Sequence, residues 1–189
     1  MTDVQLPNAL ANLVKPRRYL SCADTAKLIR RALKEAFPEV KFSVRSHVYS
    51  GGASINVGWT DGPTTKQVER VAKTFEGAYF DGMTDYKGGY SCAIDGEPVS
   101  FGADFVFCNR DVSADQEMKA ADIFARTPRT RWTELMRRFD VSLSDALRIF
   151  DNHSSPRGAA VSFLHATPAP QFDGRRSALA DSVAVLDKH

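Results

Sequence analysis

The sequence has no long apolar segment and few cysteines, and both absences narrow the class of protein. No apolar run approaches the roughly 20 residues that cross a bilayer, and the first residues lack the apolar stretch of a signal peptide. Cys22, Cys92 and Cys108 lie far apart and form no CxxC pair. An odd number of dispersed cysteines is typical of a reducing compartment. We therefore expect a cytoplasmic protein with no membrane partner, whose cysteines pack as small core residues.

Motifs of the common enzyme classes are absent as well. The sequence contains neither GxxxxGK[ST] nor GxGxxG, the usual phosphate-binding loops, and no GxSxG, the nucleophile elbow. The four histidines do not cluster with cysteines or carboxylates at the spacing of metal ligands. We therefore expect no cofactor, no metal and no catalytic residues, in a protein that is not an enzyme.

One pair of carboxylates leaves an enzymatic alternative open. Asp81 and Asp85 flank Gly82-Met83-Thr84 in a Gly-rich loop, where two carboxylates can hold a divalent cation or act as an acid/base pair. Aspartate beside glycine is also typical of tight turns, in which the side chain bonds to local backbone amides. The turn interpretation is favoured, and a metal-dependent hydrolase is the alternative.

Charge is nearly balanced overall but unevenly distributed. The net charge is +2, yet residues 15–45 contain nine Lys/Arg and three Asp/Glu, whereas residues 81–122 contain three Lys/Arg and nine Asp/Glu. Such polarity orients a protein on an acidic partner or helps two subunits pair. Nucleic acid, a complex bound to nucleic acid, another protein and a second copy of the chain (a homodimer) are therefore the candidate partners.

Hydrophobic spacing predicts an α+β domain over residues 21–111, preceded by an N-terminal arm over residues 1–20. Helices are expected over residues 21–37 and from Thr64 to about Gly77, each opened by a capping-box pattern. Alternating apolar and polar residues predict strands over residues 40–48 and 54–60, joined at Gly51-Gly52, and over residues 90–94 and 101–107. This α-β-β-α-β-β order predicts helices packed on one face of an antiparallel sheet.

After this domain the apolar residues recur with the 3.6-residue period of helices. Residues 112–152 are expected to form a small helical segment, with helices over residues 114–125, 131–139 and 143–151. The short joint Asp140-Val141-Ser142 and the nearby arginines fit a DNA-reading helix-turn-helix, although plain helix packing explains the same pattern. Residues 153–189, which begin with a stretch rich in Ser, Pro, Ala and Gly, are expected to form a linker and a C-terminal tail with a weak helix over residues 178–186.

Basic side chains on several surfaces are candidates for binding nucleic acid or another partner. Helical spacing aligns cations on the outer faces of both helices, and the polar sheet face combines cations with His47, Asn56 and Tyr49. The candidate residues are Lys27, Arg30, Arg31 and Lys34 in the first helix, Lys66, Arg70 and Lys73 in the second, Lys41 and Arg45 in the sheet, and Arg131, Arg137 and Arg138 in the helical segment. Two interpretations without binding stay open. Solvated helix faces are normally rich in Lys and Arg, and the C-terminal helices could cover the polar face of the sheet.

Several strings between residues 20 and 110 resemble one family. They are Thr25–Arg30, Ala32–Lys34, Phe37–Pro38, Val40–Arg45, Tyr49–Gly52, Ser54–Val57, Trp59–Pro63 and Phe80–Met83. The sequence resembles the large polyvalent protein associated domains, which occur in multidomain proteins of phages and conjugative elements and also as stand-alone proteins. The resemblance implies a mobile-element setting and supplies no catalytic residues.

These observations predict a non-enzymatic accessory protein of a mobile genetic element or its bacterial host. It is expected to bind nucleic acid, or a complex that handles nucleic acid such as one in host defence, through its basic faces. The alternatives are a protein-interaction or dimerisation module that does not bind nucleic acid, and the metal-dependent hydrolase using Asp81 and Asp85.

Overall fold

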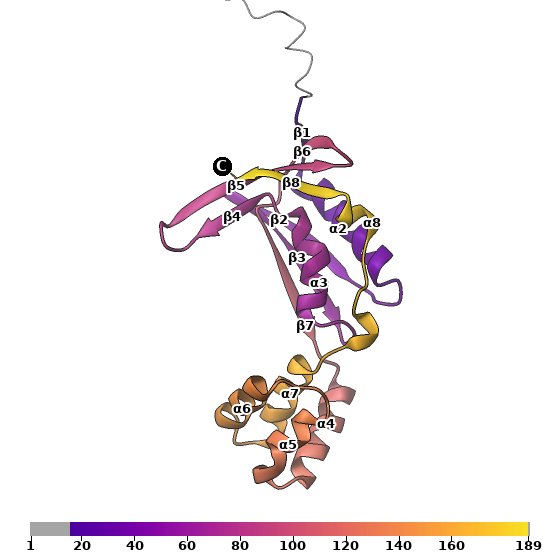
Figure 1. The fold of residues 1–189 in the computed structure, drawn as a ribbon, viewed down its shortest axis with the longest axis vertical. Coiled ribbons are helices and arrows are strands. Elements are labelled where there is room, and N and C mark those ends of the chain that lie inside the picture. Colours follow the sequence, from indigo (N-terminus) through magenta and orange to yellow (C-terminus); the bar gives the residue numbers. More distant parts are fainter. Residues whose placement is uncertain (1–15, 189) are drawn as a thin grey trace, which may run out of the picture.

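The structure is a computed structural model that describes residues 16–188. These residues form two lobes (Figure 1). An α+β lobe is built from residues 16–113 and 167–188, and a helical lobe of residues 114–166 is inserted between those two parts of the chain. The predicted α+β class is confirmed.

A three-stranded sheet and two helices form the centre of the α+β lobe. Strands β2 (Ser43–Tyr49) and β3 (Gly52–Thr60) form the expected antiparallel hairpin, and Gly51 in its turn has a φ of +86°, which suits glycine. Strand β7 (Phe105–Asp111) runs parallel to β3 on the other side. Helices α2 (Cys22–Ala36) and α3 (Thr65–Ala72), the latter continued by the 3-10 turn η1 (Lys73–Phe75), share one apolar core with the sheet. The two helices therefore cover one face of this sheet.

A second sheet lies at the end of the lobe far from the helical lobe (Figure 1). Its strand order is β1 (Arg18–Leu20), β6 (Glu97–Phe101), β5 (Tyr86–Ile94) and β4 (Ala78–Asp81), and β8 (Val183–Lys188) also pairs with β5. The β4–β5 hairpin projects sideways from the lobe (Figure 1). The segment expected to be a Gly-rich loop over residues 81–89 is thus largely part of this hairpin.

The arrangement differs from the single antiparallel sheet expected from the sequence. The strand expected over residues 101–107 is interrupted at Gly102, whose N–H donates to the Leu20 carbonyl over 2.7 Å. A Cβ at position 102 would lie 2.7 Å from the same oxygen, so the chain approaches α2 too closely for any residue but glycine. The residues before this point pair with β5, and those after it join β3 in parallel. Two mixed sheets are the result.

The helical lobe has a separate hydrophobic core. Helices α4 (Ala114–Arg126), α5 (Trp132–Arg137) and α6 (Leu143–Asn152) confirm the three expected helices, with the 3-10 turn η2 (Arg129–Arg131) preceding α5. Phe124 is fully buried and contacts the rings of Trp132 and Phe163 at centroid distances of 5.3 and 5.4 Å. Burying each of these large side chains contributes about 1.5–3 kcal/mol.

The expectation of a linker and tail over residues 153–189 is wrong for most of that segment. Helix α7 (Pro156–Ala166) is capped by Ser155, begins with proline and buries Ala159, Ala160 and Phe163 in the core of the helical lobe. The chain then returns through η3 (Pro170–Phe172) and α8 (Ala178–Asp181) to strand β8. The small residues that indicated a linker are the ones that allow close packing of α7 against α4.

Two further expectations can be compared with the structure only over residues 16–188. Of the N-terminal arm, residues 1–15 lie outside the described part of the chain, and residues 18–20 form strand β1, which pairs in parallel with β6. Across residues 16–188, no helix combines the length and the apolar character that crossing a membrane requires.

Candidate nucleic-acid interface

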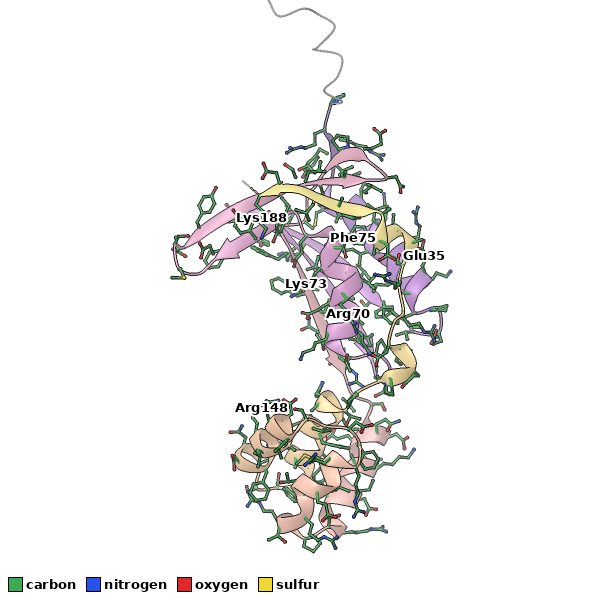
Figure 2. All side chains as sticks on the ribbon, in the orientation of Figure 1. Glu35, Arg70, Lys73, Phe75, Arg148 and Lys188 are labelled. Carbon is green, nitrogen blue, oxygen red and sulfur yellow. The ribbon has the colours of Figure 1, made fainter. Side chains whose placement is uncertain are left out.

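A cleft of about 530 Å³ separates the two lobes on the side of α3. The N-terminal half of α3 forms one wall, α6 and α7 contribute Asp145, Arg148, Ser162 and His165, and the returning segment from Ala166 to Asp173 closes one end. Figure 2 shows Arg70 on α3 and Arg148 on the helical lobe on opposite sides of this space. Two of the predicted binding residues, Lys66 and Arg70, therefore face an arginine that is about 80 positions away in the sequence.

The start of α3 is built by a complete capping box. The Thr64 hydroxyl accepts from the Gln67 N–H over 3.3 Å, and the Gln67 side chain accepts from the Thr64 N–H over 2.8 Å. The Gln67 amide group also donates to the Ala169 carbonyl over 2.9 Å and to the Asp173 carboxylate. One buried side chain thus fixes the helix terminus and joins it to the returning segment that closes the cleft.

The start of α3 carries a cation and no acidic residue. The first turns of α2, α4 and α6 contain acidic residues, whereas the first turn of α3 contains none and carries Lys66. A cation at a helix N-terminus opposes the helix dipole and costs about 0.3–1 kcal/mol. An anion in the cleft would reverse that cost, because it is attracted both by Lys66 and by the free N–H groups of the helix.

The two carboxylates of the cleft are already engaged by protein groups. Asp145 accepts from the Ser142 hydroxyl over 2.8 Å and from Arg148 over 3.1 Å, and these hydrogen bonds hold the pKa of Asp145 below its usual value. Asp173 accepts from Gln67. Within residues 16–188, Lys66 and Arg70 have no carboxylate at ion-pair distance, although the charge of Lys66 also helps to lower the pKa of Asp145. The α3 wall is therefore free to meet an anion.

A buried arginine connects the lobes behind the cleft. Arg110 on β7 donates from Nη1 to the Leu164 carbonyl on α7 over 3.0 Å, and its Nε is buried without a hydrogen-bond partner. Burial lowers the pKa of Arg110, and partial burial together with Arg110 lowers the pKa of His165. His165 is consequently neutral at pH 7, and the cationic groups that line the cleft are Lys66, Arg70 and Arg148.

The predicted stripe on α2 lies outside the cleft and is largely occupied. Lys27 pairs with Asp24 at 2.8 Å, Arg31 pairs with Glu35 at 3.5 Å, and Arg30 donates to the Val44 carbonyl over 2.5 Å. Lys34 is exposed. On α3, Lys73 pairs with Glu69 at 2.9 Å. Such exposed pairs contribute little to stability, but each one reduces the positive charge offered to a phosphate.

The two candidate residues assigned to the sheet, Arg45 and Lys41, lie on different surfaces. Arg45 lies on the face of the β2–β3–β7 sheet that α2 and α3 leave uncovered, in one row with Asn56 and Phe107. Lys41 precedes β2 and lines a different hollow beside Glu39 and Phe172. The sequence analysis missed Phe107 because strand β7 was expected to end there and to pair within an antiparallel sheet. It missed Arg148 because no sequence signal relates α6 to α3.

The predicted arginines of the helical lobe are divided between ion pairs and solvent. Glu134 pairs with Arg131 at 3.2 Å and with Arg138 at 2.8 Å, while Arg137 is exposed. Helix α6, which would be the recognition helix, exposes Leu143 and Leu147. Helix α6 also carries the exposed Arg148, so the DNA-reading helix-turn-helix and plain helix packing both stay predictions.

The structure gives Asp81 a role in a turn. Its carboxylate accepts from the Met83 N–H over 3.0 Å and from the Thr84 hydroxyl over 2.9 Å, and these bonds lower the pKa of Asp81. Asp85 has a φ of +51°, a conformation that aspartate tolerates in turns. Among residues 16–188 no group of three or more His, Cys, Asp or Glu side chains is placed to hold a metal ion. Nothing in this hairpin favours the hydrolase alternative.

Comparison with known proteins identifies one family. Residues 20–113 match the family model described as large polyvalent protein associated domain 29. This range contains α2, α3 and strands β2 to β7, and the helical lobe lies outside it. The match associates the chain with phages and mobile elements. Comparisons with curated proteins and with solved structures give no match.

Proposed function

Since the chain belongs, through residues 20–113, to the large polyvalent protein associated domain family, we propose that it is a cytoplasmic, non-enzymatic accessory protein that binds nucleic acid in the cleft between its lobes. The observation that carries the proposal is the convergence of Lys66, Arg70 and Arg148 on this cleft. Phosphates are the anions that a row of such cations fits best in a mobile-element setting.

The cost of placing Lys66 at the start of α3 supports the same function. Helices α2, α4 and α6 have an acidic first turn, whereas α3 has Lys66 and α7 has Arg157 there. Arg157 pairs with Glu117, but Lys66 has no carboxylate at ion-pair distance within residues 16–188. Residues that reduce stability without a structural gain are typical of binding sites. A phosphate group at the N-terminus of α3 would receive hydrogen bonds from free backbone N–H groups as well as from the cations.

The proposal predicts a specific dependence on salt. Arg148 shares its charge with Asp145, whereas Lys66 and Arg70 have no carboxylate at ion-pair distance within residues 16–188. Two cations that neutralise two phosphates of duplex DNA give a slope of log K against log salt concentration of about −2, because each contact contributes about −0.9. We expect Arg70→Glu to weaken binding and to reduce the magnitude of the slope by about one. The measurement is fluorescence anisotropy with labelled duplex DNA over a range of salt concentrations.

A matched control separates the cleft from general electrostatics. Lys34→Glu changes the net charge by the same amount on the outer face of α2, and we expect it to leave the slope nearly unchanged. Equal losses in both variants would contradict a site in the cleft. Absence of binding at low salt, together with concentration-dependent dimerisation in sedimentation, would replace the proposal by the protein-interaction alternative.

A further inference from the structure

The uncovered face of the β2–β3–β7 sheet has a composition unlike that of a solvated surface. In the register of the sheet, His47, Ser54 and Phe105 form one row, and Arg45, Asn56 and Phe107 form the next. A third row contains Ser43, Gly58 and Asn109. Phe107 is 51% exposed and Tyr49 at the end of β2 is 45% exposed. None of the residues in these three rows lines the cleft between the lobes.

The rings lie along the two outer strands. His47 and Tyr49 on β2 have ring centroids 5.8 Å apart, and Phe105 and Phe107 on β7 have centroids 6.4 Å apart. The central strand β3 places the smaller residues Ser54, Asn56 and Gly58 between them. Adjacent strands are about 4.8 Å apart, so the two aromatic rows stand roughly 10 Å apart on either side of a low floor.

Cations accompany the rings on both strands. Arg45 shares a row with Phe107 and makes no ion pair within residues 16–188. Lys87 from the β4–β5 hairpin lies 6.0 Å from the centre of the Phe105 ring while it pairs with Asp104 at 2.7 Å. The exposed side-chain amides of Asn56 and Asn109 complete a surface of rings, cations and amides. Carboxylates lie at its two ends, with Asp104 beside Gly52 and Tyr49 and Asp111 opposite Thr60.

We infer that this face binds single-stranded nucleic acid, with bases stacked on Tyr49 and Phe107 and a phosphate on Arg45. Exposed rings accept the faces of unpaired bases, whereas the bases of a duplex are stacked on one another and present only their edges. Aromatic rings and arginine are also enriched in protein interfaces, so failure of single strands to bind is the outcome that favours a protein partner. The site goes beyond the proposed function, since it does not use the cleft.

Gly58 offers a way to close the site without disturbing the fold. A Cβ at this position would have its nearest neighbour, the Asn109 carbonyl oxygen, 4.0 Å away, and Gly58 does not adopt a left-handed conformation. Glycine inside a strand reduces stability, and a β-branched residue favours the strand. We therefore expect Gly58→Val to keep or raise the unfolding temperature while its side chain covers the floor next to the row of Arg45, Asn56 and Phe107.

The test measures binding of the full chain to fluorescent oligothymidylate, oligouridylate and a duplex of the same length. We expect the single strands to bind more tightly than the duplex at this site, and Phe107→Ala, Tyr49→Ala and Gly58→Val each to weaken them. Loss of one stacked base corresponds to a Kd about 5- to 150-fold higher, from about 1–3 kcal/mol per base. Comparison of the two oligonucleotides distinguishes DNA from RNA as the ligand.

Matched controls lie on the projecting hairpin. Phe80 is 57% exposed and Tyr86 is 53% exposed on strands of the other sheet, so Phe80→Ala and Tyr86→Ala remove the same side chains elsewhere. Equal effects in the paired variants, or unchanged binding in Phe107→Ala, would overturn the inference. So would failure of both single strands to bind at low salt. Arg70→Glu separates the two proposals, because single-strand binding lost in Phe107→Ala and retained in Arg70→Glu supports this face alone.

Discussion

The side chain of Gln67 joins the α+β lobe to the segment that returns from the helical lobe, and its replacement gives a sharp test of the fold. Gln67→Glu keeps the oxygen that accepts from the Thr64 N–H. It removes the donor to the Ala169 carbonyl, worth about 1 kcal/mol, and the donor to the Asp173 carboxylate, worth about 1.5–3 kcal/mol. We expect the free energy of unfolding at pH 7 to fall by about 3 kcal/mol or more, because two carboxylates then face each other at a position where Gln67 is 5% exposed.

The sign of the pH dependence follows from this geometry. Burial and Asp173 raise the pKa of the introduced carboxyl in the folded protein above its unfolded value of about 4.3. The loss of stability is therefore complete at neutral pH and shrinks as the pH falls through the folded pKa towards about 4. Gln67→Met removes both donors and also the acceptor for the Thr64 N–H, but it adds no charge, so its loss of stability should not increase towards neutral pH. Urea unfolding at several pH values measures both, and a pH-independent loss in Gln67→Glu would refute the reasoning.

Three further predictions concern the α+β lobe. Burial raises the pKa of Glu76, whose carboxylate accepts from the Val106 N–H over 2.8 Å. Glu76→Gln should therefore raise the free energy of unfolding at pH 7, and this gain should disappear as the pH falls below about 4. An unchanged dependence of stability on pH would contradict this. A Cβ at Gly77 would lie 2.2 Å from the Phe101 carbonyl oxygen, so Gly77→Ala should cost at least about 1–3 kcal/mol in urea unfolding, whereas Gly82→Ala, with nothing within 4 Å, should stay within about 0.5 kcal/mol. Burial raises the pKa of all three thiols, that of Cys108 to about 12, so none should react with a thiol reagent at pH 8 until denaturant is added; fast labelling of Cys108 in the native protein would show that the site opens.

Local patterns predicted the elements that obey local rules. The capping boxes at Ser21 and Thr64 and the alternation across the β2–β3 hairpin are properties of neighbouring residues, and the sequence displays them directly. The break at Gly102 was not visible, because it depends on the carbonyl of Leu20, which approaches only in the folded chain. From the sequence alone, a glycine inside an apolar strand is compatible both with a continuous strand and with a break.

The candidate sites were predictable in part for the same reason. Lys66 and Arg70 belong to one helix, and their spacing identifies a shared face. Their partner Arg148 comes from another lobe, so only the path of the chain through β7 and α7 brings it near. Likewise Arg45 and Asn56 follow from the hairpin register, whereas Phe107 joins their row through a parallel pairing that sequence alternation does not specify.

The pairing of the last strand with β5 has a consequence for how the protein is made on the ribosome. Strand β8 joins β5 along Tyr90–Ile94, and Phe172, Leu179 and Ala180 complete the core of the α+β lobe. Strand β8 and these three core residues are synthesised after the helical lobe, whose own core lies within residues 114–166. The helical lobe is therefore able to fold first, while the edge of β5 and part of the first core remain incomplete until residues 172–188 have been made. A nascent chain that stops after α7 would expose that edge to other chains.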